Sequence, residues 1–166
     1  MVTPRPPRRP IDPERRGNLQ AVRGAAYALL ARRDFTTGEL RERLAANGWD
    51  PDAVARAIAE LLEERMLDDA RYASNYVAYH AARGRGPIRI GAELRARIVP
   101  AELIEAALAS VPDWCARART ARIRKFGPKA PAAWPEKGRQ ARFLQYRGFS
   151  SDHIRAALGT DFNLDE

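Results

Sequence analysis

One apolar pattern recurs three times along this chain of 166 residues, at an interval of 50 residues and without a gap. Each copy has a leucine, a small or apolar pair four and five positions later, and apolar residues ten and fourteen positions later. This spacing predicts two amphipathic helices that meet at a tight corner. A fixed period is typical of repeat proteins, which usually bind another macromolecule, so a binding protein is a better hypothesis than an enzyme. The copies are Leu44, Gly48, Trp49, Val54 and Ile58; Leu94, Ile98, Val99, Ile104 and Leu108; and Leu144, Gly148, Phe149, Ile154 and Leu158.

Helix start and stop signals lie between the apolar stripes. Thr36 followed by Glu39 fits a capping box, and Gly48 lies where a left-handed residue would end that helix. Asp50 and Pro51 then provide an N-cap and a first-turn proline. In the middle copy Ile98 replaces the corner glycine, so we expect a different turn geometry there. These signals predict an all-α fold of three tandem three-helix repeats that form an elongated, curved array.

The expected organisation has five parts. Residues 1–17 are rich in Pro and Arg and show no apolar periodicity, which predicts a disordered arm. Three-helix repeats follow at 18–66, 67–111 and 112–159, and residues 160–166 form an acidic tail.

The positive charge is concentrated in the third repeat. The whole chain has a formal net charge of +8, and residues 113–159 alone hold eleven Lys and Arg against three acids. On the first helix of this repeat we expect Arg117, Arg122 and Arg124 to face solvent while Trp114, Ala121 and Ile123 face inward. Such a basic face favours contacts with phosphates or with an acidic protein surface over a merely solvated helix.

The sequence offers no constellation that predicts catalysis. Asp68 and Asp69 precede a helix and are expected to cap it, while His80 and His153 lack the spacing of metal ligands. We therefore expect a protein that is not an enzyme and has neither a cofactor nor a metal. Cys115 is the only cysteine, and no segment has the apolar length of a signal peptide or a membrane helix. These features predict a cytoplasmic protein that does not bind membranes.

Several segments of the three repeats form one further pattern: Arg32-Arg33-Asp34, 39–44 and Gly48-Trp49 in the first repeat; 67–73, 83–87 and 93–95 in the second; and Phe126-Gly127 and 142–150 in the third. Together they resemble the RecX family, the regulatory proteins of the RecA recombinase. The resemblance covers about residues 20–159, and this chain departs from the family pattern at Ile98 and in its N-terminal arm. It implies three tandem three-helix repeats that dock in the groove of a RecA–DNA filament and inhibit filament extension, ATP hydrolysis, strand exchange and co-protease activity.

On this hypothesis the partners are the RecA filament and, weakly and non-specifically, single- and double-stranded DNA, and the protein is a monomer. Whether the basic third repeat contacts DNA or RecA stays open. The alternatives are a helical DNA-binding regulator of helix-turn-helix type that acts without RecA, and a scaffold without a nucleic-acid partner. The candidate residues for contacts with a partner or nucleic acid are Arg83, Arg85, Arg89, Arg95, Arg117, Arg122, Arg124, Lys125, Arg139 and Arg142.

Overall fold

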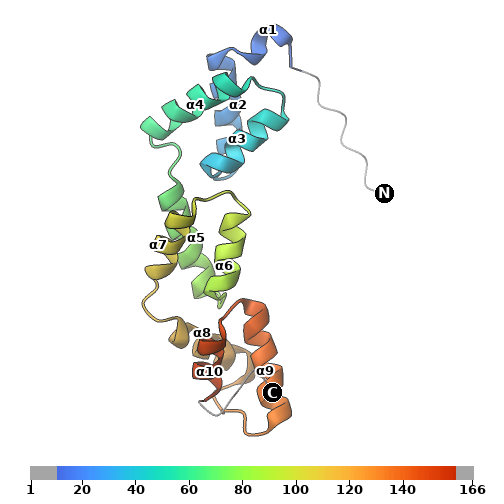
Figure 1. Ribbon diagram of the computed structural model, residues 1–166, viewed down its shortest axis with the longest axis vertical. Coiled ribbons are helices and arrows are strands. Elements are labelled where there is room, and N and C mark those ends of the chain that lie inside the picture. Colours follow the sequence, from blue (N-terminus) through green and yellow to red (C-terminus); the bar gives the residue numbers. More distant parts are fainter. Residues whose placement is uncertain (1–10, 160–166) are drawn as a thin grey trace, which may run out of the picture. The chain divides into compact units, whose positions relative to one another are not determined.

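The computed structural model describes residues 11–159, so most of the predicted N-terminal arm (1–10) and the acidic tail (160–166) lie outside the described residues. Within 11–159 the chain forms ten α-helices and no strands (Figure 1). The predicted all-α fold is confirmed. The helices are α1 (Pro13–Arg16), α2 (Leu19–Leu30), α3 (Thr37–Ala46), α4 (Pro51–Glu63), α5 (Asp69–Ala82), α6 (Pro87–Arg95), α7 (Ala101–Ala109), α8 (Trp114–Phe126), α9 (Trp134–Arg147) and α10 (Ser151–Leu158).

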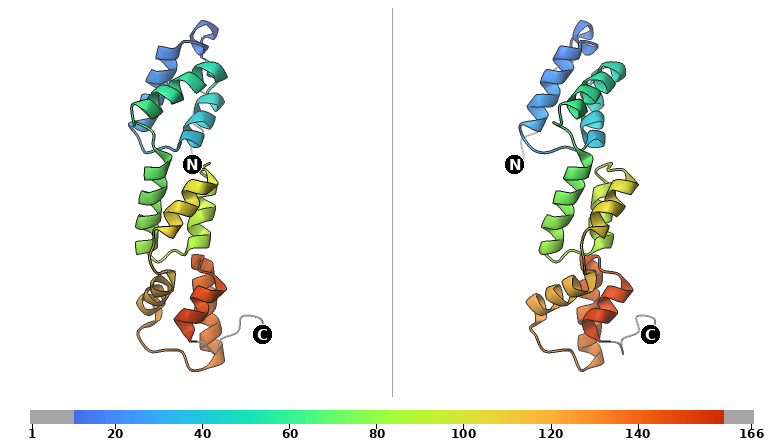
Figure 2. Two further views of the ribbon diagram at one scale, coloured as in Figure 1. Left: turned by 60° about the vertical axis from the view of Figure 1, so that its left-hand side comes forward. Right: turned by 90° about the vertical axis from the view of Figure 1, so that its left-hand side faces the viewer.

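The chain divides into two compact units, Met1–Asp68 and Asp69–Glu166. The first unit contains one three-helix repeat, α2–α4, and the second contains two, α5–α7 and α8–α10. In both views of Figure 2 the three helices of each repeat lie against one another. The predicted set of three three-helix repeats is therefore present.

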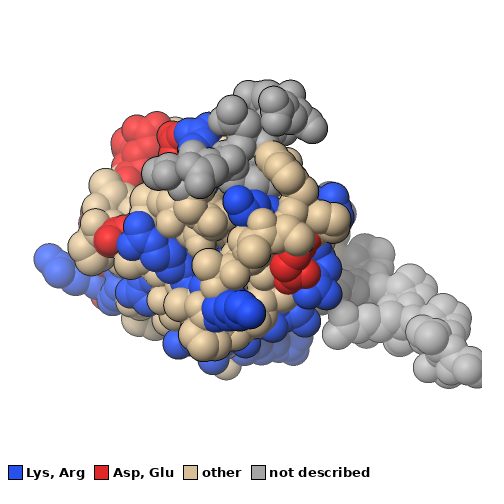
Figure 3. Space-filling model, turned by 90° about the horizontal axis from the view of Figure 1, so that it is seen from below, with Lys and Arg blue, Asp and Glu red and all other residues tan. Residues whose placement is uncertain are grey.

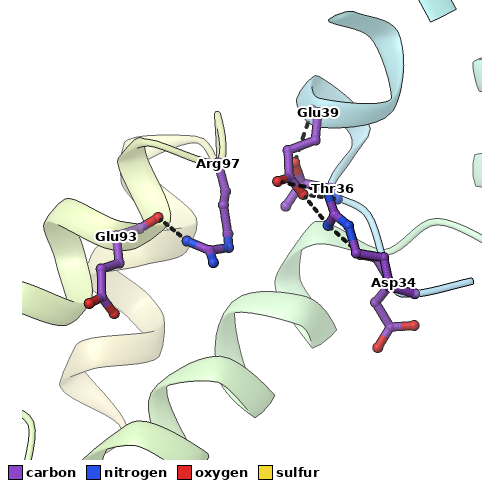
Figure 4. Close-up of polar contacts among 6 residues, drawn as sticks. Asp34, Thr36, Glu39, Glu93 and Arg97 are labelled. Carbon is purple, nitrogen blue, oxygen red and sulfur yellow. Dashed lines mark hydrogen bonds and ion pairs between the residues drawn. The ribbon is translucent and has the colours of Figure 1, made fainter. Parts of the chain in front are cut away.

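In the first repeat the predicted caps are confirmed. Thr36 Oγ1 accepts a hydrogen bond of 3.1 Å from the Glu39 amide, and the Glu39 carboxylate accepts one of 3.4 Å from the Thr36 amide (Figure 4). Asp50 caps α4 through the amides of Asp52 and Ala53. These interactions place the helices so that their apolar stripes form one core. It is built on Val22, Ala26, Leu40, Leu44, Ala53, Val54, Ala57, Ile58, Leu61 and Leu67.

A short helix precedes this repeat. Asp12 caps α1, and Pro13 occupies its first turn, where a missing amide hydrogen costs nothing. The carbonyl of Arg16 accepts a hydrogen bond of 3.1 Å from the Asp50 amide, which ties α1 to the start of α4. The prediction that residues 1–17 lack secondary structure is therefore wrong for Pro13–Arg16. The reason is local: Asp-Pro followed by Glu is a strong N-terminal signal even where no apolar stripe follows.

In the second repeat the corner residue Ile98 behaves as a glycine would. Its φ is +59°, in the same left-handed region as Gly48 (+90°) and Gly148 (+89°) of the other repeats. The predicted change of turn geometry is therefore wrong: the packing of α6 against α7 holds the corner, and isoleucine adopts a conformation that β-branched residues rarely take. The core of this repeat contains Ala73, Val77, Ala81, Ile90, Leu94, Val99, Ile104 and Ala107.

In the third repeat α8 is rotated relative to the predicted orientation. Ile123 is 43% exposed, whereas Arg122 is only 5% exposed, so the expectation that Ile123 faces inward and Arg122 outward is wrong. The predicted turn at Gly148 is confirmed, and Ser150 begins α10 in a capping box with His153. The core of this repeat contains Ala118, Ala121, Ala141, Leu144, Phe149, Ile154 and Leu158.

Two helix ends join the second and third repeats within the second unit. The Gly86 amide donates a hydrogen bond of 2.8 Å to the Arg147 carbonyl, and the Ile88 amide donates one of 3.0 Å to the Gly148 carbonyl. Free amides at the start of α6 thereby bind free carbonyls at the end of α9, where the helix dipoles also attract each other. This contact fixes the two repeats against each other.

Candidate nucleic-acid interface

A basic pocket lies where the second and third repeats meet. We call it the junction pocket. Its walls come from the turn after α5, from α8 and from α9, and it is open to solvent, with a volume of about 170 Å³. The lining residues are Arg83, Gly84, Ala121, Arg124, Lys125, Phe143 and Arg147.

The turn after α5 is pressed onto α8. Gly84 comes so close that a β-carbon on it would lie 3.2 Å from Cβ of Ala121. Arg124 reaches back from α8 and donates a hydrogen bond of 3.0 Å to the carbonyl of Ala82, at the end of α5. This carbonyl has no partner within its own helix, so the arginine satisfies it and also holds the pocket wall.

The four cations of the pocket are not neutralised by acids. Among residues 11–159, no carboxylate lies within ion-pair distance of Arg83, Arg124, Lys125 or Arg147. Two of them pack on aromatic rings instead: Cζ of Arg83 lies 3.5 Å from the ring centroid of Tyr79, and Cζ of Arg147 lies 5.2 Å from that of Phe143. Four positive charges around one small cavity attract an anion.

Two of the predicted contact residues, both arginines of the second repeat, already form ion pairs with a carboxylate of the protein itself. Arg85 Nη1 lies 2.6 Å from Glu93 Oε2, and Arg89 Nε lies 3.0 Å from Glu93 Oε1. Tyr76 donates a third hydrogen bond, of 2.8 Å, to the same carboxylate. Burial alone would raise the pKa of the Glu93 carboxyl, but the hydrogen bonds from Tyr76 and Arg89 and the charge of Arg85 hold it below its ordinary value. The carboxylate is therefore charged and cancels much of the positive charge of Arg85 and Arg89.

The backbone of Glu93 has a partner as well. Arg97 Nη1 donates a hydrogen bond of 2.9 Å to the Glu93 carbonyl, as Figure 4 shows. Arg97 also lies over the Tyr76 ring, with Cζ 4.9 Å from the centroid. Glu93 thus organises the basic side chains along this part of the second repeat.

Arg122 has a structural role. Its guanidinium donates hydrogen bonds to the carbonyls of Lys129 (3.0 Å) and Pro128 (3.3 Å) and to Oε1 of Gln140 (3.4 Å). The side chain thereby holds the loop between α8 and α9. Because it is buried, its N–H donors are not accessible to a partner. The prediction that Arg122 contacts a partner is wrong, because the charge count did not reveal which arginine faces the loop carbonyls.

The remaining predicted arginines lie at the surface, outside the lining of the junction pocket. Arg95, Arg117, Arg139 and Arg142 are exposed, and Arg139 pairs with Glu136 at 2.9 Å. No described contact brings these four residues together, so their role in binding stays a prediction. The face drawn in Figure 3 nonetheless carries many Lys and Arg side chains and few Asp and Glu.

The sequence pattern singled out three of the four pocket cations, Arg83, Arg124 and Lys125, and missed Arg147. It also missed two aromatic residues beside them, Phe143 and Tyr79. Tyr79 is 53% exposed and is not part of the apolar stripe that contains Tyr76, and this position outside the stripe is the signal that could have found it.

Other kinds of site receive no support from the described residues. No three His, Cys, Asp or Glu side chains in this part of the chain are grouped so that they could hold a metal ion. None of its helices has the length and hydrophobicity needed to cross a membrane.

Three family models match the chain, one for each repeat. They are described as the first, second and third three-helix domains of RecX and match residues 23–61, 68–108 and 113–158. Regulatory protein RecX of Halorhodospira halophila is 45% identical over 148 residues, which cover 89% of this chain and 92% of that protein. Regulatory protein RecX of Xanthomonas axonopodis pv. citri is 39% identical over 142 residues, covering 85% of this chain and 86% of that protein.

Solved structures have the same fold. The crystal structure of RecX from Lactobacillus salivarius aligns with a TM-score of 0.74 at 20% identity, over 84% of this chain and 93% of that one. A crystal structure of regulatory protein RecX aligns with a TM-score of 0.67 at 19% identity, over 87% of this chain and 74% of that one.

Proposed function

The chain belongs to the RecX family of regulatory proteins, and on that premise we propose that it binds the RecA–DNA filament and inhibits RecA. The inhibited activities are filament extension, ATP hydrolysis, strand exchange and co-protease action. The protein modulates DNA repair and recombination in this way as a binding protein, without chemistry of its own, and we place it in the cytoplasm.

The observation that carries this proposal is the junction pocket, with four cations that no described carboxylate neutralises. A filament of protein on DNA is a polyanion with a repeating surface. Each of the three repeats can contribute a modest contact to such a surface, and linked contacts multiply into a high overall affinity. Phosphate neutralisation by Lys and Arg also makes binding depend on salt.

The test is RecA's single-strand-dependent ATPase and strand exchange, measured with substoichiometric amounts of this protein. We expect both activities to fall, because one bound molecule blocks extension of a whole filament. Full RecA activity at every ratio would refute the proposal. Tight, sequence-dependent binding to duplex DNA without RecA would favour the helix-turn-helix regulator instead.

A paired set of variants then locates the contact. Arg124→Glu/Arg147→Glu reverses charge in the junction pocket, while Arg41→Glu/Arg43→Glu makes the same change on the exposed face of α3. We expect the first pair to lose most of the inhibition and the second to keep it. Circular dichroism of each variant confirms that it is folded.

A further inference from the structure

We propose that the junction pocket and Tyr79 together bind single-stranded nucleic acid, with one backbone phosphate in the pocket and a neighbouring base stacked against Tyr79 and Arg83. This rests on the proposed function only in taking the DNA strand of the filament as the biological ligand. The site itself is argued from the geometry of the second and third repeats.

The size and charge of the cavity suit a single phosphate group. Its volume is about 170 Å³, well above the roughly 10–15 Å³ that a single water needs, so a phosphate group can enter it. Arg83, Arg124 and Lys125 approach it from the turn after α5 and from α8, and Arg147 completes the ring from α9. Guanidinium groups match phosphate oxygens with paired donors, and a lysine adds a point charge.

The availability of these charges separates the pocket from the basic residues that already have an acidic partner. Arg85 and Arg89 share Glu93, Arg139 pairs with Glu136 and Arg155 pairs with Asp152. An anion at those positions would compete with a carboxylate that is already bound. In the pocket it would compete with no described carboxylate, so binding there releases more free energy per phosphate.

Tyr79 provides the second half of the site. Its ring is exposed, and the guanidinium plane of Arg83, which also lines the pocket, lies over it. Bases of single strands stack on aromatic rings and on arginine planes. Because Arg83 belongs to both features, a strand whose phosphate enters the pocket has a stacking surface next to it.

This combination predicts a preference for single strands. In a duplex both faces of each base are covered by the neighbouring pairs, so a duplex offers its phosphates but no free base for Tyr79. A duplex therefore gains only the electrostatic part of the binding free energy.

The experiment measures fluorescence anisotropy of a labelled oligothymidylate with the full chain, in the absence of RecA, over a series of salt concentrations. We expect Tyr79→Ala to weaken binding roughly 5- to 100-fold without changing the slope of log K against log salt, because only stacking is lost. Tyr79→Phe keeps the ring and retains binding. Lys125→Ala/Arg147→Ala weakens binding at least about tenfold and lowers the slope by roughly 0.7, the value for one phosphate of a single strand.

The matched control is Arg41→Ala/Arg43→Ala, which removes two positive charges, as the pocket variant does, but from the exposed face of α3 and outside the pocket. We expect it to bind almost as the parent does. Equal losses in both double variants would mean diffuse attraction and would overturn the proposal. So would an unchanged affinity in Tyr79→Ala, equal affinity for a duplex of the same length, or equally strong competition by a polyglutamate peptide of the same charge.

Different outcomes would refute the proposed function and the proposed binding site. If the parent binds the oligonucleotide through the pocket but leaves RecA's ATPase unchanged, the proposed function fails and the site stands. If it inhibits RecA but Lys125→Ala/Arg147→Ala and Arg41→Ala/Arg43→Ala bind the oligonucleotide equally well, the site fails and the proposed function stands.

Discussion

Gly86 lies so close to Gly148 that a β-carbon on Gly86 would come within 2.3 Å of the carbonyl carbon and oxygen of Gly148. In the other direction, a β-carbon on Gly148 would lie 2.3 Å from Cβ of Arg89. The glycine before α6 and the corner glycine after α9 therefore form one joint, in which two backbones meet and neither can carry a side chain. This joint holds the second repeat at the distance from the third that forms the junction pocket.

Gly86→Ala tests this joint. The added methyl group must displace the Gly148 carbonyl, which strains the two hydrogen bonds between α6 and α9. We expect the free energy of unfolding to fall by about 2–4 kcal/mol, from overpacking and weakened hydrogen bonds together. Urea denaturation followed by circular dichroism measures it.

The control for this change is Gly24→Ala on α2. No atom lies within 4 Å of a β-carbon placed there, so alanine adds no clash. Alanine has a higher helix propensity than glycine in a helix interior. We therefore expect the free energy of unfolding to rise by roughly 0.5–1 kcal/mol. Similar effects of the two substitutions would contradict the steric account of the joint.

Substitutions at Ile98 test whether the corner between α6 and α7 is strained. A non-glycine residue in the left-handed region costs roughly 1–2 kcal/mol, more than the roughly 0.5–1 kcal/mol of backbone entropy that glycine adds to the unfolded state. The side chain is 42% exposed, so its removal also loses buried apolar area, in Ile98→Gly and in Ile98→Ala alike. We expect Ile98→Gly to have a higher melting temperature than Ile98→Ala, because only glycine relieves the backbone strain. A lower melting temperature for Ile98→Gly than for Ile98→Ala would show that the corner is not strained.

Arg122 and its surface neighbour Arg117 form the third comparison. Arg122→Ala leaves the carbonyls of Lys129 and Pro128 without their donor inside a partly buried loop. We expect it to lower the free energy of unfolding by roughly 2–4 kcal/mol, because several hydrogen bonds to a charged group are lost. Arg117→Ala, on the exposed face of the same helix, should leave stability almost unchanged. Thermal unfolding of both variants checks this, and equal effects would rule out the structural role of Arg122.

Whether the sequence predicts an interaction depends on how far apart along the chain the interacting residues lie. Caps such as Thr36 with Glu39, and the turn at Gly48, depend on residues three or four positions apart, so their pattern is visible in the chain. The inward rotation of Arg122 depends on carbonyls in the loop after α8, which no periodicity encodes. Arg147 joins Arg83 and Lys125 only because the joint at Gly86 brings two repeats together. The pocket is therefore a property of tertiary packing, although most of its charges were recognisable.

Two histidines make stability depend on pH between neutral and mildly acidic conditions, because the fold lowers the pKa of each. Burial lowers the pKa of His80 below 6.5, and the positive charge of Arg85 lowers it further. Burial also lowers the pKa of His153, although Asp152 and Asp113 act in the opposite direction. The folded state therefore binds fewer protons than the unfolded state over the range that begins near pH 6.5 and extends below the folded pKa values. The free energy of unfolding has the whole contribution of the two neutral histidines above this range, and it falls as the pH decreases through the range.

We expect the free energy of unfolding to decrease steadily from pH 7.5 to pH 5.5, measured by urea denaturation at constant ionic strength. The lowered pKa values of Glu93 and Glu136 do not contribute there, since those groups titrate near or below their ordinary value of 4.5. His80→Phe/His153→Gln should flatten the profile. Phenylalanine keeps a ring beside Tyr76, whose centroid lies 4.2 Å from that of His80, and glutamine preserves the capping box with Ser150. A double variant that loses as much stability as the parent over this range would show that other groups cause the decrease.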